Sequence, residues 1–333
     1  MKAAPSPSRA GRPRIGLVLG AGGAVGHAFH SGVLSAIADA TGWDARNAEV
    51  IVGTSAGSLV GALLRAGLSA ADLAARAMDR QLSPEGRHIV SIAETARGDQ
   101  PPIPSRPPRA SRVPAMSAPG AFVRAALQPW NARPAALVAA AMPEGRVPTE
   151  LISTGLRPLF DRWPESSLWI NAVRLETGRR VTFGRDIRVT TDVATAVAAS
   201  CAIPGFFAPV AVDGVRYVDG GVHSPTNADL VAGLELDLVV VSSPMSMTRR
   251  GVRLTPDQLG RRLSLMALAR EVGRIRAAGT PVLTFQPTGK VLDVMGWNAM
   301  DASRRADVAR EAHASATRRL ERPDAHERVA LLD

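Results

Sequence analysis

Two short apolar runs, each ending in glycines and each followed by a helix-like segment, constrain the fold of this chain most. Residues Arg14 to Leu19 form the first run, and a glycine-rich loop and the helix-like stretch His27–Ala40 come after it. Residues Glu49 to Thr54 form the second, and the helix-prone stretch Ala56–Ala66 follows at once. Buried parallel strands have continuous apolar sequences and lead into helices through short turns. The two runs therefore predict an α/β fold built on a parallel sheet.

The rest of the sequence continues this alternation. A β-hairpin is predicted over Val210–Val218, because Asp213-Gly214 supplies a tight turn between two apolar segments. Further strands are predicted at Leu168–Leu175, Arg180–Phe183, Leu236–Ser242 and Pro281–Phe285, and further helices at Asp192–Ser200, Thr255–Ala278 and Ala299–Leu320. The pattern favours the α/β class with a mainly parallel central sheet.

One domain over residues 14–323 accounts for these elements. Residues 1–13 are basic and rich in proline and serine, which predicts a disordered tail, and residues 324–333 are predicted to be a C-terminal tail. Residues 97–149 are rich in proline and lack a regular pattern, so they are predicted to be a variable insertion or lid.

Cysteine content and apolar segments limit the location of the protein. Cys201 is the only cysteine, so no intrachain disulfide can form and a zinc site built on several thiolates is excluded. A reducing cytoplasm is the simplest location. The chain has no run of about 20 consecutive apolar residues, so no membrane-spanning helix is predicted. The N-terminus also lacks the apolar segment of a secretory signal.

The charge of the chain allows two interpretations. The formal net charge is +10, which fits either an ordinary solvated surface or attraction to anionic lipid headgroups. Aromatic residues make up only 4% of the chain, and no motif interleaves them with the basic residues. Nucleic-acid binding is therefore not predicted.

The pentapeptide Gly53-Thr54-Ser55-Ala56-Gly57 lies between the second apolar run and its helix. In a G-x-S-x-G turn the serine occupies a sharp strand-to-helix bend, and the flanking glycines let neighbouring backbone approach closely. The N-terminal end of the helix dipole points at the same place. Ser55 is therefore the candidate nucleophile of a serine acyl hydrolase. The alternative is a glycine-rich turn in which Ser55 only caps the helix.

A glycine-rich loop over residues 20–26 follows the first predicted strand. Its backbone N–H groups could hold a phosphate or form an oxyanion hole. The G-x-G-x-x-G spacing of dinucleotide-binding loops is not met, because Val25 and His27 occupy the sixth position of the two frames. Nucleotide binding, as in a nucleotide-dependent oxidoreductase, stays the minor alternative. The amides near Gly22 and Gly23 are predicted to stabilise an oxyanion.

The partner of the candidate nucleophile is harder to assign. The chain has six histidines, which are His27, His30, His88, His223, His313 and His326. The last two come late enough for an α/β-hydrolase, but they lie in Arg/Glu-rich stretches typical of solvated helices. His223, four residues after Asp219, is better explained as a structural or surface residue. Asp219 is better placed, because it closes an apolar strand and precedes Gly220-Gly221, which leave space around its carboxylate.

Four ordered pieces of the sequence together resemble the patatin-like phospholipases. They are the glycine-rich loop, the G-x-S-x-G pentapeptide, the run Ala199-Ser-Cys-Ala-Ile-Pro-Gly-Phe-Phe-Ala-Pro209, and Asp219-Gly220-Gly221. The resemblance covers residues 14–241 clearly and the remainder weakly. It implies a three-layer α/β/α sandwich and a Ser-Asp dyad that uses no histidine.

Carried onto this sequence, the resemblance implies Ser55 as nucleophile and Asp219 as base. It also implies an oxyanion hole at Gly22, Gly23 and Ala24. The motif glycines are Gly20, Gly26, Gly53, Gly57, Gly220 and Gly221. The family loop usually reads G-G-G-x-R-G, whereas here Ala21 replaces the first glycine and Val25 stands where arginine or lysine is common. No cofactor or metal ion is implied. The expected substrate is a lipid or other acyl ester, with a peripheral membrane contact.

The insertion over residues 97–149 would then lie over the site. Its apolar and basic side chains are predicted to form an interfacial acyl-binding cap, through Phe122, Trp130, Leu137, Met142, Arg124 and Arg133. The alternative is an ordinary loop that packs on the domain. Two other functions stay open: a non-catalytic module that binds an acyl lipid, and a thioesterase or acyltransferase that uses Ser55. The sequence does not determine the oligomeric state.

Overall fold

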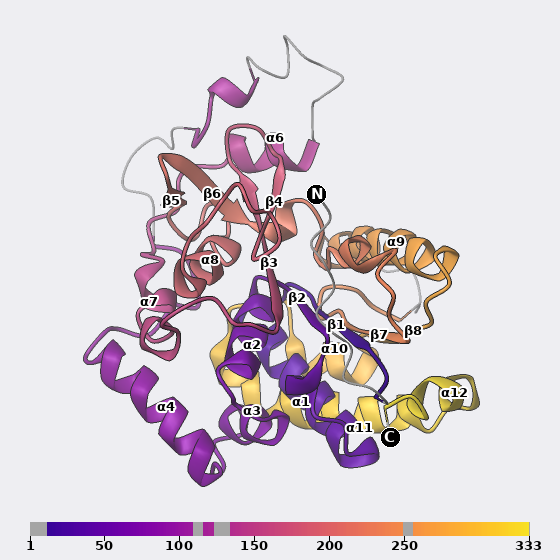
Figure 1. The fold of residues 1–333 in the computed structure, drawn as a ribbon. Helices are drawn as coiled ribbons and strands as arrows, with labels where there is room; N and C mark the ends of the chain where they lie inside the picture. Colours follow the sequence, from indigo (N-terminus) through magenta and orange to yellow (C-terminus); the bar gives the residue numbers. More distant parts are fainter. Residues whose placement is uncertain (1–11, 109–115, 123–133, 249–255, 333) are drawn as a thin grey trace.

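The structure is a computed structural model that describes residues 12–108, 116–122, 134–248 and 256–332. At its centre is an eight-stranded sheet with the order β5-β6-β3-β2-β1-β7-β8, and β4 also pairs with β3 (Figure 1). The strands are β1 Ile15–Leu19, β2 Val50–Thr54, β3 Ser167–Arg174, β4 Arg180–Phe183, β5 Val210–Val212, β6 Val215–Asp219, β7 Leu238–Ser242 and β8 Val282–Phe285. The five strands β3, β2, β1, β7 and β8 are parallel, and β4, β5 and β6 pair antiparallel beside them.

The strands alternate between two hydrophobic cores, one on each face of the sheet. In β1, Leu17 and Leu19 enter the larger core and Val18 enters the smaller one. Helices α1, α2, α3, α8 and α11 contribute to the larger core, whereas α9 covers the other face (Figure 1). Burial on both faces explains why these strands are continuously apolar. The architecture is the expected three-layer α/β/α sandwich with a mainly parallel central sheet.

Helices connect β1 to β2, β2 to β3, β4 to β5 and β7 to β8. The helices are α1 Gly23–Thr41, α2 Ala56–Arg65, α3 Ala70–Ala77, α4 Pro84–Arg97, α6 Pro134–Ala141, α7 Glu150–Ser153, α8 Val193–Ser200, α9 Pro256–Ala277, α10 Gly289–Met295, α11 Arg305–Leu320 and α12 His326–Val329. The sequence patterns predicted α1, α2, α8, α9 and α11, but α1 begins at Gly23 and not at His27. The second half of the glycine-rich loop is therefore the first turn of a helix.

The predicted hairpin is confirmed as β5 and β6. Asp213 and Gly214 connect the two strands and have φ angles of 50° and 74°. Two consecutive left-handed residues make the tight turn whose twist matches that of the flanking strands. This hairpin carries Asp219 as its last residue.

Two described parts of the proline-rich insertion, residues 116–122 and helix α6, pack against β3 and β6. Ala118, Ala121 and Ala140 are buried with residues of β3 and β6, and Phe122 and Leu137 pack against the same cluster. Of the side chains predicted to form the cap, Trp130, Arg124 and Arg133 lie outside the described residues. Apolar contact with the sheet explains the position of Phe122 and Leu137.

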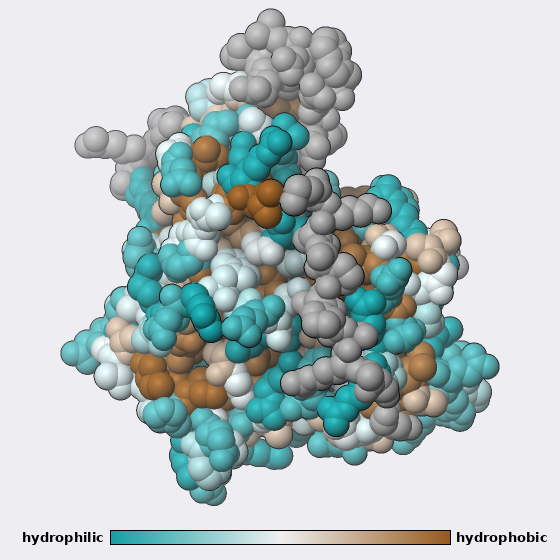
Figure 2. Space-filling model, viewed as in Figure 1, coloured by the Kyte–Doolittle hydropathy of each residue, from teal (hydrophilic) through white to brown (hydrophobic). Residues whose placement is uncertain are grey.

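The C-terminal segment, which the sequence predicted to be a tail, forms short helices that pack on the domain. A 3₁₀ turn over Pro323–Ala325 precedes α12, and both Ala325 and Leu332 are buried in the larger core. The predicted N-terminal tail lies almost entirely outside the described residues. Most of the surface seen in Figure 2 is hydrophilic, with apolar side chains gathered in separate patches.

Candidate active site

Ser55 lies in the turn between β2 and α2. Its φ and ψ angles are 53° and −121°, a left-handed conformation that is strained for a residue with a side chain. The turn can be this sharp because Gly57 lies against β1, where a Cβ atom would overlap the Leu19 carbonyl. The Ser55 amide donates to Ser200 Oγ at 2.9 Å, which fixes the turn to α8. The predicted strand–serine–helix arrangement is therefore present.

The register of the sheet brings Asp219 to the level of Ser55. Thr54, the last residue of β2, pairs with Asn171 of β3, and Asp219, the last residue of β6, pairs with the next residue, Ala172. Although β6 runs in the opposite direction to β2, both strands therefore end at the same height. Strand pairing thus brings together Ser55 and Asp219, which are 164 positions apart in the sequence.

The Asp219 carboxylate is buried and interacts with two donors. The Gly221 amide donates to Oδ1 at 2.7 Å, and the Ser55 side chain lies near enough to lower the pKa of the carboxyl. Burial nevertheless raises the pKa of Asp219 to about 6, because the desolvation is larger than the effect of these two donors. The neighbouring Cys201 thiol is also buried, which raises its pKa to about 12 and keeps it protonated. The arrangement thus provides a hydroxyl beside a carboxylate of raised basicity.

The glycine-rich loop offers three amides toward the same region. In the described part of the chain, the amides of residues 20, 21, 25 and 26 donate to backbone carbonyls, whereas those of Gly22, Gly23 and Ala24 have no backbone acceptor. Gly23 has a φ of 61°, and a Cβ atom there would collide with the Ala299 carbonyl. Gly23 and Ala24 line the same cavity as Ser55. These are the amides that the sequence predicted for the oxyanion hole. They lack backbone acceptors because the first N–H groups of a helix have no partner within the helix.

His30 holds this loop in place, a role that the sequence did not indicate. Its Nε2 donates to the Gly20 carbonyl at 2.8 Å, and its Nδ1 accepts from the Ser242 hydroxyl at 2.8 Å. Burial lowers the pKa of His30 to about 4, so the ring is neutral. His30 lies four residues after the loop, on the buried face of α1, and this position in the sequence could have suggested its role.

Three other histidines are poorly placed to act as a base beside Ser55. His27 lies in the cavity of Ser55, but burial, Arg76, His30 and Arg305 lower its pKa to about 3. A ring that resists protonation this strongly is a poor proton acceptor. His313 pairs with Asp39 on the surface at 2.8 Å, and His326 contacts the Glu321 carbonyl. The sequence-based doubt about His313 and His326 is consistent with these positions.

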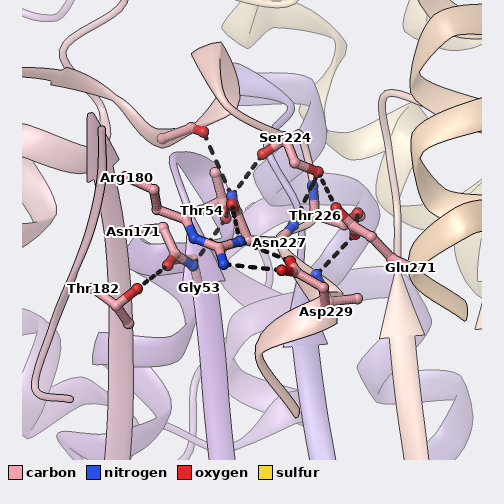
Figure 3. A network of polar contacts seen from close by, with 12 residues as sticks. Gly53, Thr54, Asn171, Arg180, Thr182, Ser224, Thr226, Asn227, Asp229 and Glu271 are labelled. Atoms are coloured by element: carbon pink, nitrogen blue, oxygen red, sulfur yellow. Dashed lines mark hydrogen bonds and ion pairs between the residues drawn. The ribbon is translucent and has the colours of Figure 1, made fainter. Parts of the chain in front are cut away.

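A buried polar network joins Thr54, the residue before Ser55, to Asn171 and Asn227 (Figure 3). Asn227, which is fully buried with a φ of 52°, donates through Nδ2 to Thr54 Oγ1 at 3.1 Å and to the Gly220 carbonyl at 3.5 Å. Its Oδ1 accepts from Arg180, which also binds the Asp229 carboxylate through two nitrogens. Asn227 thus connects the residue before Ser55 to the residue after Asp219. The sequence analysis missed it, because only the fold joins these segments.

The cavity beside Ser55 has a volume of about 360 Å³. One wall is apolar and comes from residues that belong to or pack against a small cluster around Phe206, including Ile103, Ile152, Ile203 and Phe207. Pro102 and Ile103 belong to the predicted insertion and line the cavity, whereas the cap residues Phe122, Leu137 and Met142 do not. The predicted cap is therefore not confirmed: Phe122 and Leu137 pack against the cluster beside β3 and β6, and Met142 is exposed.

Among the residues that the structure describes, no three or more His, Cys, Asp and Glu side chains are grouped so that they could hold a metal ion. None of the helices in these ranges is long and apolar enough to cross a membrane.

Comparison with known proteins agrees with this geometry. The family model for patatin-like phospholipase matches residues 17–232. The chain therefore belongs to the patatin-like phospholipase family. The matched region contains Ser55, Asp219 and the glycine-rich loop.

Two solved structures are similar to this chain at low sequence identity. The crystal structure of VipD from Legionella pneumophila is 14% identical with a TM-score of 0.44, and the match covers 95% of this chain and 69% of that one. The type III effector protein ExoU is 16% identical with a TM-score of 0.35, and the match covers 93% of this chain and 53% of that one. This chain thus spans about half the length of the ExoU chain.

Proposed function

We propose that this protein is a lipid acyl hydrolase of the phospholipase A type that releases fatty acids through an acyl-enzyme on Ser55. The observation that carries the proposal is the position of Ser55, on its sharp strand-to-helix turn, beside the buried Asp219 carboxylate, whose pKa is raised to about 6. Membership of the patatin-like phospholipase family supports the choice of an ester of a fatty acid as substrate.

In the first step Asp219 accepts the Ser55 proton while Oγ attacks the ester carbonyl. The amides of Gly22, Gly23 and Ala24 stabilise the negative charge on the carbonyl oxygen, a contribution of about 3 kcal/mol for one such donor. Collapse of the tetrahedral intermediate breaks the ester bond, and the leaving alcohol takes the proton from Asp219. The acyl group stays on Ser55.

In the second step the Asp219 carboxylate accepts a proton from water as the water attacks the acyl-enzyme. The same amides stabilise the second oxyanion, and the proton returns to Ser55 as the fatty acid leaves. The apolar wall of the cavity would hold the acyl chain in both steps, because moving methylene groups from water to an apolar surface lowers the free energy. A thioesterase or acyltransferase would share the first step and differ only in acyl donor or acceptor.

A fluorophosphonate probe tests whether Ser55 is a nucleophile. The intact protein is expected to be labelled at Ser55, and the Ser55→Ala variant is expected to lose the label. The Ser58→Ala variant is a matched control, because Ser58 lies in the first turn of the same helix and its hydroxyl donates to the Ser55 carbonyl. No labelling of the intact, folded protein would favour a module that binds acyl lipids without turnover.

We also propose that the protein contacts membranes peripherally through α9. The side chains of Leu259, Leu263 and Met266 are more than half exposed and share one face of this helix, and Arg270 and Arg274 continue that face. Exposed apolar residues followed by arginines are typical of helices that lie at the surface of anionic membranes. Leu263→Glu is expected to weaken sedimentation with anionic vesicles. Ile187→Glu, at an exposed apolar residue elsewhere, is the control.

A further inference from the structure

The cavity beside Ser55 has a second wall that is strongly cationic. Arg76 of α3, Arg97 at the end of α4 and Arg305 at the start of α11 all line it. Among the described lining residues there is no aspartate or glutamate. Three segments that are far apart in the sequence thus bring three guanidinium groups to one small cavity.

The three charges are not neutralised by neighbouring acids. Only Glu94, an exposed residue, approaches Arg76, at 4.0 Å. Arg97 and Arg305 form no ion pair within the described residues. One nitrogen of Arg97 donates to the Leu151 carbonyl, and one nitrogen of Arg305 donates to the Ala302 carbonyl. Each guanidinium has five N–H donors, so most of their hydrogen-bonding capacity is available to a ligand.

Arg97 and Arg305 are both close enough to Arg76 for their charges to interact with it. Burial lowers the pKa of Arg76, Glu94 raises it, and Arg97 and Arg305 lower it further. Arg76 and Arg305 also help to keep His27 neutral. An anion in this cavity would relieve the mutual repulsion, whereas a second cation would increase it.

We propose that Arg76, Arg97 and Arg305 form a site for a phosphate oxyanion and make the cavity selective for acyl esters whose headgroup carries a net negative charge. Guanidinium groups bind phosphate oxygens through paired N–H donors. A zwitterionic headgroup would bring a quaternary ammonium group toward three guanidinium groups with no carboxylate to receive it. The site also supplies the cation that the glycine-rich loop lacks at Val25. The inference rests on the proposed function, because it assigns the headgroup end of the substrate.

Binding measured without turnover tests the site directly. In Ser55→Ala protein, calorimetry compares monomeric short-chain phosphatidylglycerol, phosphatidylcholine of the same acyl chains, and inorganic phosphate. Phosphatidylglycerol is expected to bind about tenfold more tightly than phosphatidylcholine. Inorganic phosphate is expected to compete with it at higher concentration. Equal affinity for the two lipids would overturn the proposal, and phosphate binding that equals lipid binding would limit the site to free phosphate.

Substitutions identify the residues. Arg305→Gln and Arg76→Gln, made in the Ser55→Ala protein, are each expected to remove most of the preference for phosphatidylglycerol, and Arg76→Lys is expected to retain part of it. Arg310→Gln is the matched control, because Arg310 lies on the same helix as Arg305 but is exposed and pairs with Asp307. If Arg310→Gln reduces the preference as much as Arg305→Gln, the general surface charge is responsible and the proposal fails.

Kinetics in the active protein separate this inference from the proposed function. The ratio of kcat/KM for phosphatidylglycerol to that for phosphatidylcholine is expected to fall about tenfold in Arg305→Gln, mainly through KM. If neither lipid is hydrolysed and the fluorophosphonate does not label Ser55, the proposed function is wrong. The anion site still stands in that case, provided that the binding preference and its loss in Arg305→Gln are observed.

Discussion

Two buried carboxylates, Asp219 at the end of β6 and Glu271 on α9, face very different surroundings. Burial raises the pKa of both. Glu271 accepts three strong hydrogen bonds, from Ser224 Oγ at 2.5 Å, Thr226 Oγ1 at 2.6 Å and the Ala228 amide at 2.8 Å (Figure 3). Within the described ranges, the Asp219 carboxylate accepts one hydrogen bond, from the Gly221 amide, and the Ser55 side chain lies beside it.

The difference separates a structural carboxylate from the one proposed to react. The donors around Glu271 fix the segment between residues 224 and 228, which brings Asn227 next to Thr54 and Gly220. Beside the carboxylate of Asp219 lies the Ser55 hydroxyl, which loses its proton in the proposed mechanism. Burial alone therefore does not mark a catalytic base; the identity and number of the donors do.

Asp219→Asn is expected to produce the largest effect, a fall in turnover of roughly 1,000-fold, because an amide cannot accept the Ser55 proton. Ester hydrolysis by the purified variant measures it. Glu271→Gln should change turnover far less, since Glu271 touches no reacting atom. Similar losses in the two variants would remove the distinction between the carboxylates.

The same Asp219→Asn variant should be more stable than the intact protein at pH 7. The folded-state pKa of about 6 exceeds the usual 3.8, so the folded protein binds more protons than the unfolded chain between these values, and stability falls as the pH rises through this window. Removing the charge is expected to recover up to about 3 kcal/mol at pH 7. Denaturant unfolding at pH 7 and at pH 4 measures the gain, which should disappear at the lower pH.

Glu271→Ala is expected to lower the free energy of unfolding by about 3 kcal/mol, because the buried Ala228 amide and two hydroxyl groups lose their acceptor. Glu271→Gln keeps one oxygen acceptor and should lose less. Urea unfolding of both variants compares them. Equal stability of the alanine variant and the intact protein would show that these hydrogen bonds do not stabilise the segment.

Asn227→Gly is expected to lower kcat roughly tenfold with little change in KM, because the connection between Thr54 and Gly220 that positions the dyad is lost. Glycine keeps the left-handed backbone of this residue. Asp213→Gly, at another left-handed position in the exposed hairpin turn, is the matched control. A loss that appears only in KM would contradict a positioning role for Asn227.

The pH dependence of kcat/KM is expected to show an acidic limb near pH 6, since protonated Asp219 cannot act as base. Activity at pH 5 should be about tenfold below the plateau. A limb near pH 4 would mean that the Asp219 carboxylate is not desolvated in the working enzyme.

Much of the fold and the centre of the site could be predicted from the sequence. Apolar runs followed by glycines indicated the parallel strands, and the pentapeptide around Ser55 indicated the elbow, because both depend on neighbouring residues. The proline-rich segment had no such local signal. Its predicted cap is not confirmed, and the positions of Phe122 and Leu137 depend on long-range contacts with the sheet.

By itself, the sequence determined which residue types are present and which short segments form strands, turns and helices. Ser55 lies on its turn for local reasons: a strand, a glycine on each side and a helix. Only the tertiary structure decided that Asp219 lies beside Ser55, because the register of β6 on β3 sets the position of Asp219 along the sheet. It also decided that Arg76, Arg97 and Arg305 share one cavity, since charges from three separate helices meet only after the chain has packed.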